Sequence, residues 1–108
     1  MSKPLDRDSL QRVAPKLAEL TEQVLFGDIW QRSLLSARER SLITLATLSA
    51  LGREQQLPWH LDFAQKNGLS REELVELFTH QAFYAGWPAA VTALALLQEE
   101  NHSCPLAE

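Results

Sequence analysis

Apolar residues recur three and four positions apart along most of the chain, and no stretch alternates polar and apolar residues over the length of a strand. This pattern predicts an all-α protein. The first predicted helical segment covers residues 8–25 and carries one apolar stripe, with Pro15 as an interruption or kink near its start. Gly27 breaks the period, and we expect a short helical turn over residues 28–32 to bury Ile29 and Trp30.

The next helix has clear signals at both ends. Ser36 followed by Glu39 is a capping box, which satisfies two otherwise unpaired amide donors at the start of a helix, and Gly52 marks the end. Between these signals the residues are apolar or small almost all the way round. That distribution is typical of a central helix contacted on several sides.

Two further helices follow from the same reasoning. One opens near Pro58, whose fixed φ suits a first turn, and closes at residues 67–68 with the glycine in left-handed geometry. Ser70 with Glu73 forms a second capping box, and the helix that it opens is expected to run to Gly86.

The last predicted helix begins at Pro88 and covers residues 89–100, while residues 101–108 lack periodicity and are expected to fray. The sequence thus predicts a bundle of about five to six helices. A length of 108 residues with 45% hydrophobic content fits a single domain over residues 1–108.

Composition excludes several classes of function. Ten basic against fourteen acidic residues leave a net charge of -4, which argues against a nucleic-acid partner. Cys104 is the only cysteine, so an intrachain disulfide, a CxxC pair and a cysteine-based zinc site are all excluded. No apolar run suits a membrane span or a signal peptide, and we expect a cytoplasmic protein without a membrane partner.

Several predicted helices are apolar on more than one side, and a domain of this size cannot bury all of that surface in its own core. We therefore expect a homo-oligomer. A tight monomeric bundle is the alternative, because fully apolar central helices also occur in monomers.

Candidate proton chemistry rests on histidine. His60 follows Trp59 in the first turn or so of its helix, where desolvation and the helix dipole both favour the neutral imidazole that a general base requires. A histidine that packs and hydrogen-bonds a backbone carbonyl is the structural alternative. His80 shares a helix face with Glu76 and Tyr84, so the three side chains could form a hydrogen-bonded row, or else an ordinary polar stripe.

We predict no metal site, because one histidine with one or two carboxylates falls short of a usual first coordination shell. The chain also lacks GxGxxG, GxxxxGK[ST] and GxSxG. These absences disfavour hydride transfer and acyl-enzyme chemistry, and we expect no cofactor.

Three ordered blocks within residues 24–95 resemble the carboxymuconolactone decarboxylase family. Residues 25–32 (LFGDIWQR) and 35–46 (LSARERSLITLA) are similar to the family's G-[DE]-[IV]-W-x-R and L-x-x-R-x-R-S-L-[IV]-T-[LV]-A. The second block runs from residues 50–53 (ALGR) through His60 to Ala64 and residues 67–68. The third runs from residues 72–74 (EEL) to residues 84–90 (YAGWPAA).

The resemblance implies an all-helical fold of the alkylhydroperoxidase D type, usually a trimer or a hexamer with active sites near subunit interfaces. It also implies a cofactor-free decarboxylation, in which 4-carboxymuconolactone of aromatic catabolism becomes the β-ketoadipate enol-lactone. By the resemblance, His60 occupies the family's histidine position and is the first candidate for the acid/base group.

The chain departs from the family pattern near this histidine. Arg53 and Gln56 stand where the peroxidase branch has its CxxC pair, which excludes thiol peroxidase chemistry. The decarboxylase branch commonly has Glu at the position of Gln56 and Arg at the position of Pro58. This chain therefore lacks a carboxylate that could share a proton with His60 and a guanidinium that could bind a substrate carboxylate.

The first hypothesis is therefore a lyase that removes carbon dioxide from a carboxylated lactone or related cyclic acid. The predicted catalytic residues are His60, His80 and Tyr84, and the predicted substrate-binding residues are Arg53, Gln56, Trp59 and Trp30. Two alternatives stay open: a non-catalytic oligomeric binding protein on the same fold, and a different proton-transfer enzyme such as an isomerase.

Overall fold

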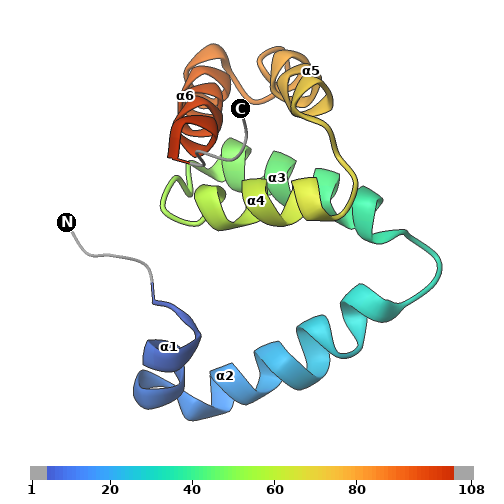
Figure 1. Ribbon diagram of the computed structural model, residues 1–108, viewed down its shortest axis with the longest axis vertical. Helices are drawn as coiled ribbons and strands as arrows, with labels where there is room; N and C mark the ends of the chain where they lie inside the picture. Colours follow the sequence, from blue (N-terminus) through green and yellow to red (C-terminus); the bar gives the residue numbers. More distant parts are fainter. Residues whose placement is uncertain (1–4, 104–108) are drawn as a thin grey trace. The chain divides into compact units, whose positions relative to one another are not determined.

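The computed structural model describes residues 5–103, with side chains described up to residue 99, and every regular element in that range is a helix (Figure 1). This confirms the predicted all-α class. The chain divides into two compact units, Met1–Ala37 and Arg38–Glu108, which are described separately below. The predicted single domain spans both units.

The elements are α1 (Arg7–Val13), α2 (Pro15–Leu20), the π-helix η1 (Thr21–Phe26), the 3-10 helix η2 (Ile29–Gln31), α3 (Ala37–Leu51), α4 (Leu57–Lys66), α5 (Arg71–Gln81) and α6 (Trp87–Ser103).

The first unit consists of short helices in succession. Asp6 and Ser9 form a capping box at the start of α1, in which the Asp6 carboxylate accepts the Ser9 N–H at 2.8 Å. The helix then breaks at Ala14, and Pro15 takes the first position of α2, where its missing N–H costs nothing. The predicted interruption at Pro15 is therefore confirmed.

The turn that contains Trp30 is more exposed than expected. Ile29 is 40% exposed, so the prediction that it is buried is wrong, whereas Trp30 is half-buried and stacks on Phe26 with ring centroids 5.8 Å apart. Three residues of 3-10 helix offer too little surface to cover both side chains. Ala18 is the only buried residue among residues 5–37.

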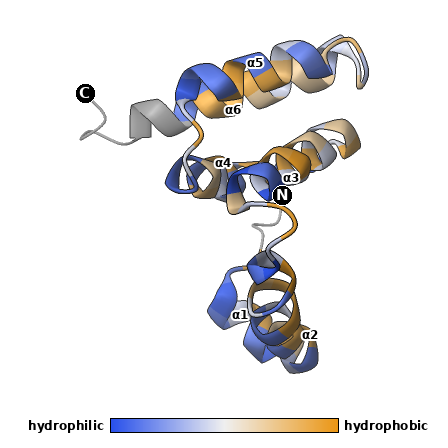
Figure 2. Ribbon diagram, turned by 90° about the vertical axis from the view of Figure 1, so that its right-hand side faces the viewer, coloured by the Kyte–Doolittle hydropathy of each residue, from blue (hydrophilic) through white to orange (hydrophobic). Residues whose placement is uncertain are grey.

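The second unit holds the hydrophobic core, to which α3, α4, α5 and α6 all contribute. Each of these helices carries both hydrophilic and hydrophobic stretches, as expected for amphipathic helices that share one core (Figure 2). The buried core residues are Leu45, Leu57, Leu61, Ala64, Leu69, Leu74, Phe78, Ala90, Ala93 and Leu97. Phe78 is the largest side chain that is fully buried.

Helix α3 is buried along one stripe only. Ser41, Leu45 and Ser49 are its buried residues and lie four apart, on one face. Ile43 is 52% exposed and Leu51 is 61% exposed. The prediction that this helix is contacted on several sides is therefore wrong for a single copy of the chain.

Polar side chains tie the helices of this unit together. Asn67 donates from Nδ2 to Oγ of the buried Ser41 at 2.9 Å, which links the end of α4 to α3. Gln81 donates from Nε2 to the carbonyl oxygen of Ala46 at 3.3 Å, which links α5 to α3. These bonds satisfy polar groups that the core would otherwise leave unpaired.

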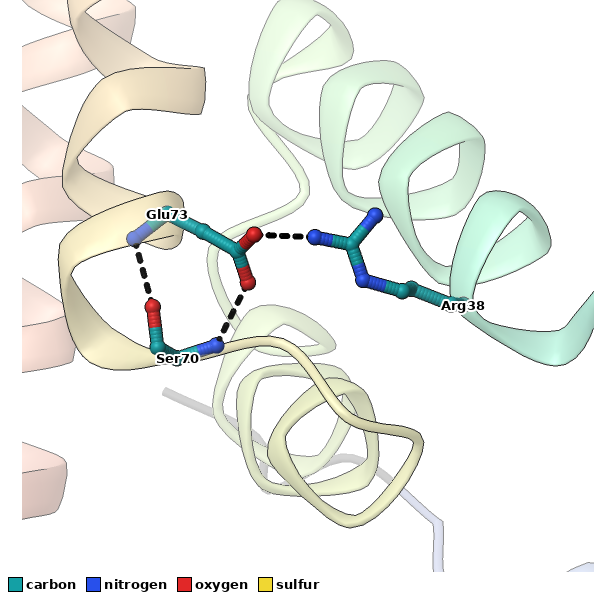
Figure 3. A network of polar contacts seen from close by, with 3 residues as sticks. All are labelled: Arg38, Ser70 and Glu73. Atoms are coloured by element: carbon teal, nitrogen blue, oxygen red, sulfur yellow. Dashed lines mark hydrogen bonds and ion pairs between the residues drawn. The ribbon is translucent and has the colours of Figure 1, made fainter.

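The start of α5 is a confirmed capping box joined to α3 by an ion pair (Figure 3). The Glu73 N–H donates to Ser70 Oγ and the Ser70 N–H donates to the Glu73 carboxylate, both at 3.0 Å. The carboxylate also accepts a hydrogen bond from Arg38. The pKa of Glu73 lies below its ordinary value because of the Ser70 N–H bond and, to a smaller extent, because of the nearby Arg38 charge.

The predicted end of α4 is also confirmed. Asn67 is the C-cap residue of α4, and Gly68 follows at φ +103°, a backbone conformation that residues with a side chain rarely adopt. The Leu69 N–H reaches back to the carbonyl of Ala64 at 3.0 Å and closes the helix.

Helix α5 is shorter than predicted. It ends at Gln81 rather than continuing to Gly86, because the Phe83 and Tyr84 N–H groups bond to carbonyls only three residues back, in tight turns. Gly86, at φ +111°, then reverses the chain into α6.

Helix α6 runs to Ser103, three residues beyond the predicted helix end at residue 100, and the fraying of the tail stays a prediction. The remainder of that tail, residues 104–108 with Cys104, lies outside the described residues. Within the described part of the chain, none of the helices combines the length and hydropathy needed to cross a membrane.

Candidate functional site

A cleft of about 290 Å³ opens in the second unit, between the end of α3, the start of α4 and the first turns of α6. Its walls combine apolar side chains with two hydroxyls and one carboxylate. The lining residues are Ser49, Ala50, Leu51, Gly52, Glu54, Leu57, Pro88, Ala89 and Thr92.

Local sequence signals place these walls. Gly52 adopts φ +72° and ends α3, while its N–H bonds to the carbonyl of Ser49 at 3.2 Å. Six residues later, Pro58 sits in the first turn of α4, and Pro88 does the same for α6. The cleft is thus lined by one helix end and two helix starts, each fixed by the residue type that favours it.

The polar groups of the cleft differ in how far they are already bonded. Ser49 is only 2% exposed and donates weakly from Oγ to the carbonyl of Ala89 at 3.4 Å. Glu54 is exposed and is the one ionisable side chain in the lining. No hydrogen bond or ion pair joins the Glu54 carboxylate to any residue that the structure describes.

Sequence reasoning missed Ser49, Glu54 and Thr92. Ser49 lies in a helix whose small residues indicate packing, and Thr92 lies far along the chain from the other lining groups. Glu54 was within reach, because it stands beside Arg53 and two residues before Gln56 in the loop that precedes α4.

His60 lies on α4, one turn after Leu57, and is half-buried in an aromatic environment. Its ring meets that of Trp59 edge-on with centroids 4.8 Å apart, and that of Phe63 at 6.5 Å. Burial lowers the pKa of His60 below its ordinary value, since desolvation disfavours the imidazolium. His60 is not among the residues that line the cleft.

The predicted substrate-binding residues near His60 are exposed. Arg53 and Gln56 flank Glu54 in the same loop, and neither contributes to the lining of the cleft. Trp59 is 56% exposed and packs its ring against Phe63 at 4.8 Å. One segment, residues 53–60, therefore brings together most of the groups that the sequence indicates.

The predicted row on α5 takes another form. The rings of His80 and Tyr84 stack with centroids 5.0 Å apart, and Tyr84 is 80% exposed. Among the described residues, no hydrogen bond joins Glu76 to His80. The pair therefore forms an exposed aromatic stack instead of a hydrogen-bonded triple.

Trp30 belongs to the first unit, where it stacks on Phe26, and is described with that unit alone. Within residues 5–103 no three His, Cys, Asp or Glu side chains come close enough together to hold a metal ion.

Sequence comparison finds a family and two relatives that this chain resembles. A sequence profile described as "Carboxymuconolactone decarboxylase family" matches residues 15–99. A 4-carboxymuconolactone decarboxylase of Acinetobacter baylyi is 43% identical over 74 residues, which are 68% of this chain and 55% of that protein. A nitrosuccinic acid decarboxylase of Metarhizium robertsii is 32% identical over 81 residues, which are 75% of this chain and 57% of that protein. The chain thus spans a little over half the length of the curated relatives that it matches.

Proposed function

Because this chain belongs to the carboxymuconolactone decarboxylase family, we propose that it is a cofactor-free decarboxylase of a carboxylated lactone or related cyclic acid. The observation that carries the proposal is the 43% identity, over 74 residues, to a 4-carboxymuconolactone decarboxylase. The family profile matches residues 15–99, a segment that contains the cleft, His60 and the loop before it. Its proposed place is the breakdown of aromatic compounds in the cytoplasm.

The chemistry makes few demands on a protein. Loss of carbon dioxide leaves an electron pair that must be delocalised into a neighbouring carbonyl, and the carbon must then take up a proton. The site needs a cation to orient the departing carboxylate, a donor for the enolate oxygen and an acid/base group. These roles require only side chains that the chain already has.

We assign the roles as follows. Arg53 is exposed beside the cleft and offers a guanidinium to the substrate carboxylate. His60 is the acid/base group, because burial keeps its imidazole neutral near pH 7 and able to accept a proton. His80 and Tyr84 are auxiliary donors.

Gln56 and Trp59 are proposed to contact the substrate. The Gln56 amide can donate to a lactone or enolate oxygen, but it cannot take up or release a proton as a carboxyl group would. The exposed face of Trp59 offers an apolar surface to a planar ring.

The test is the loss of ultraviolet absorbance of 4-carboxymuconolactone with purified protein and no added metal, compared with His60→Ala and His60→Gln. We expect a fall in kcat of about 100-fold or more in both variants, the usual effect of losing a general acid or base. Far-ultraviolet circular dichroism controls for folding. Variants with kcat within about threefold of the wild type would overturn the role of His60, since a general acid/base contributes far more than that.

One relative favours a second substrate class. The Metarhizium robertsii protein is named for nitrosuccinic acid, and it is 32% identical over three quarters of this chain. An adjacent nitro group stabilises a carbanion as a carbonyl does, so the same proton chemistry applies. Turnover of nitrosuccinate, without turnover of the lactone, would move the assignment to this class.

We also propose that the protein works as a homo-oligomer, a trimer or a hexamer. The support is the exposure of large apolar side chains in the second unit, more than isolated surface residues would explain. These side chains are Ile43, Leu51, Trp59, Val75, Phe83, Tyr84, Trp87 and Val91.

A further inference from the structure

The cleft contains one group that the proposed mechanism does not use, the carboxylate of Glu54. We propose that Glu54 is a catalytic residue of this cleft, which delivers the proton to the substrate carbon after carbon dioxide leaves. This inference rests on the proposed decarboxylation for its substrate class, while its geometry stands on the cleft alone.

The lining of the cleft singles out Glu54. Every other lining residue is apolar, glycine, serine or threonine, so Glu54 carries the one carboxyl group in the lining that can give or take a proton. Two other carboxylates of this unit are paired: Glu73 with Arg38, and Asp62 with Lys66 at 3.2 Å. The Glu54 carboxylate has no such partner among the described residues and is available to a ligand.

The rest of the cleft suits a small cyclic acid. A volume of about 290 Å³ is near the lower end of ordinary ligand pockets, and a single lactone ring with short acidic substituents fills such a space. Leu57 and Pro88 give apolar walls for the ring. The exposed hydroxyl of Thr92 offers a hydrogen bond to a ring or carbonyl oxygen.

The proton step balances without any further reactant. The bond between the ring carbon and the carboxylate carbon breaks, carbon dioxide leaves, and the electron pair moves into the conjugated lactone as an enolate. Protonated Glu54 then gives its proton to the carbon next to the lactone carbonyl, forming a C–H bond, and remains as a carboxylate. Because Glu54 is exposed, water restores its proton, and nothing is oxidised or reduced.

Glu54 and His60 then have separate positions. Glu54 lies on the wall of the cleft, whereas His60 lies one turn into α4 and outside the lining. The group that reaches the reacting carbon is therefore Glu54, and His60 is left to act on the carboxylate side or through a neighbour.

The experiment compares the wild type, Glu54→Gln, Glu54→Asp and the control Glu99→Gln in two assays. The first is decarboxylation of 4-carboxymuconolactone. The second is uptake of deuterium from D2O by the β-ketoadipate enol-lactone at the carbon next to its carbonyl, followed by NMR against an enzyme-free sample. Glu99 is an exposed carboxylate on α6 outside the cleft, so its loss controls for a change of charge.

We expect Glu54→Gln to lower kcat about 100-fold or more, with KM within about threefold, and to abolish enzymic deuterium uptake. Glu54→Asp should recover part of both rates, and Glu99→Gln should match the wild type. Decarboxylation that survives in Glu54→Gln would overturn the role of Glu54 and leave the proposed function standing. Deuterium uptake without decarboxylation in the wild type, lost in Glu54→Gln, would uphold Glu54 and overturn the decarboxylase. Absence of both reactions in the wild type would overturn both proposals.

Discussion

At the scale of single residues, His60 shows how burial against aromatic neighbours changes the pKa of a side chain. Its half-buried position between Trp59 and Phe63 disfavours the charged imidazole and lowers its pKa. The same shift must appear in stability, because the folded chain then binds a proton at His60 less readily than the unfolded chain does.

Above about pH 6.5, the ordinary pKa of histidine, both states are neutral at His60 and the residue adds no pH dependence. As the pH falls below that value the unfolded state is protonated first, so the free energy of unfolding decreases until His60 is protonated in the folded state as well. We predict that urea midpoints fall less between about pH 7.5 and about pH 5.5 in His60→Gln than in the wild type. The exposed His80, changed to Gln, is the control. An equal fall in all three proteins would contradict the prediction.

Local sequence indicates His60 directly, whereas it indicates Glu54 only through its place beside Arg53. An aromatic residue directly before a histidine in a first helical turn indicates desolvation from local information alone. The importance of Glu54 depends on Pro88 and Thr92, more than thirty residues away, which complete the cleft around it. Side chains that meet only through tertiary packing leave no periodic signal in the sequence.

At the scale of secondary-structure elements, the helix ends follow the cap residues closely. Helix α4 ends before Gly68, and α5 begins at the capping box of Ser70 and Glu73, both where the sequence predicts them. The end of α5 was missed because residues 82–85 continue an apolar pattern that suits either a helix or a turn. The apolar pattern alone cannot distinguish an α-helix, with N–H bonds to the carbonyl four residues back, from tight turns. In this segment the N–H groups of Phe83 and Tyr84 bond to carbonyls three residues back.

The capping box of α5 leads to a stability prediction. Ser70→Ala removes the acceptor of the Glu73 N–H and should lower the free energy of unfolding by about 1 kcal/mol. Ser33→Ala, at an exposed position outside any helix, should change it by less than about 0.5 kcal/mol. Urea unfolding followed by circular dichroism measures both. Equal effects of the two changes would mean that the cap contributes nothing.

At the scale of the whole molecule, several large apolar side chains of the second unit are exposed in a single copy of the chain. Phe83 is 77% exposed and Trp87 is 67% exposed, and their rings lie 6.5 Å apart at the turn between α5 and α6. Such a pair of neighbouring aromatic side chains is typical of a protein interface.

If copies of the chain associate through this turn, Phe83→Asp should reduce the mass in solution from three or six times 12.2 kDa toward that of one chain, with helicity unchanged. A charge placed in an apolar interface is costly to bury, whereas Phe83 contributes nothing to the core cluster. Gln11→Asp, which adds the same charge on exposed α1, should leave the mass unchanged. Light scattering coupled to size exclusion gives the masses. A wild type of one chain mass would overturn the proposed oligomer, and an assembled Phe83→Asp would exclude this turn from the interface.

The three tryptophans give the protein a built-in optical readout. Trp30 reports on the first unit through its stack with Phe26, and Trp87 begins the helix that forms one wall of the cleft. The indole of Trp59 lies against the imidazole of His60, and a cationic imidazole quenches indole emission more strongly than a neutral one does. A chain that keeps only Trp59 would therefore show the ionisation of His60 as a change in fluorescence, without any added label or substrate.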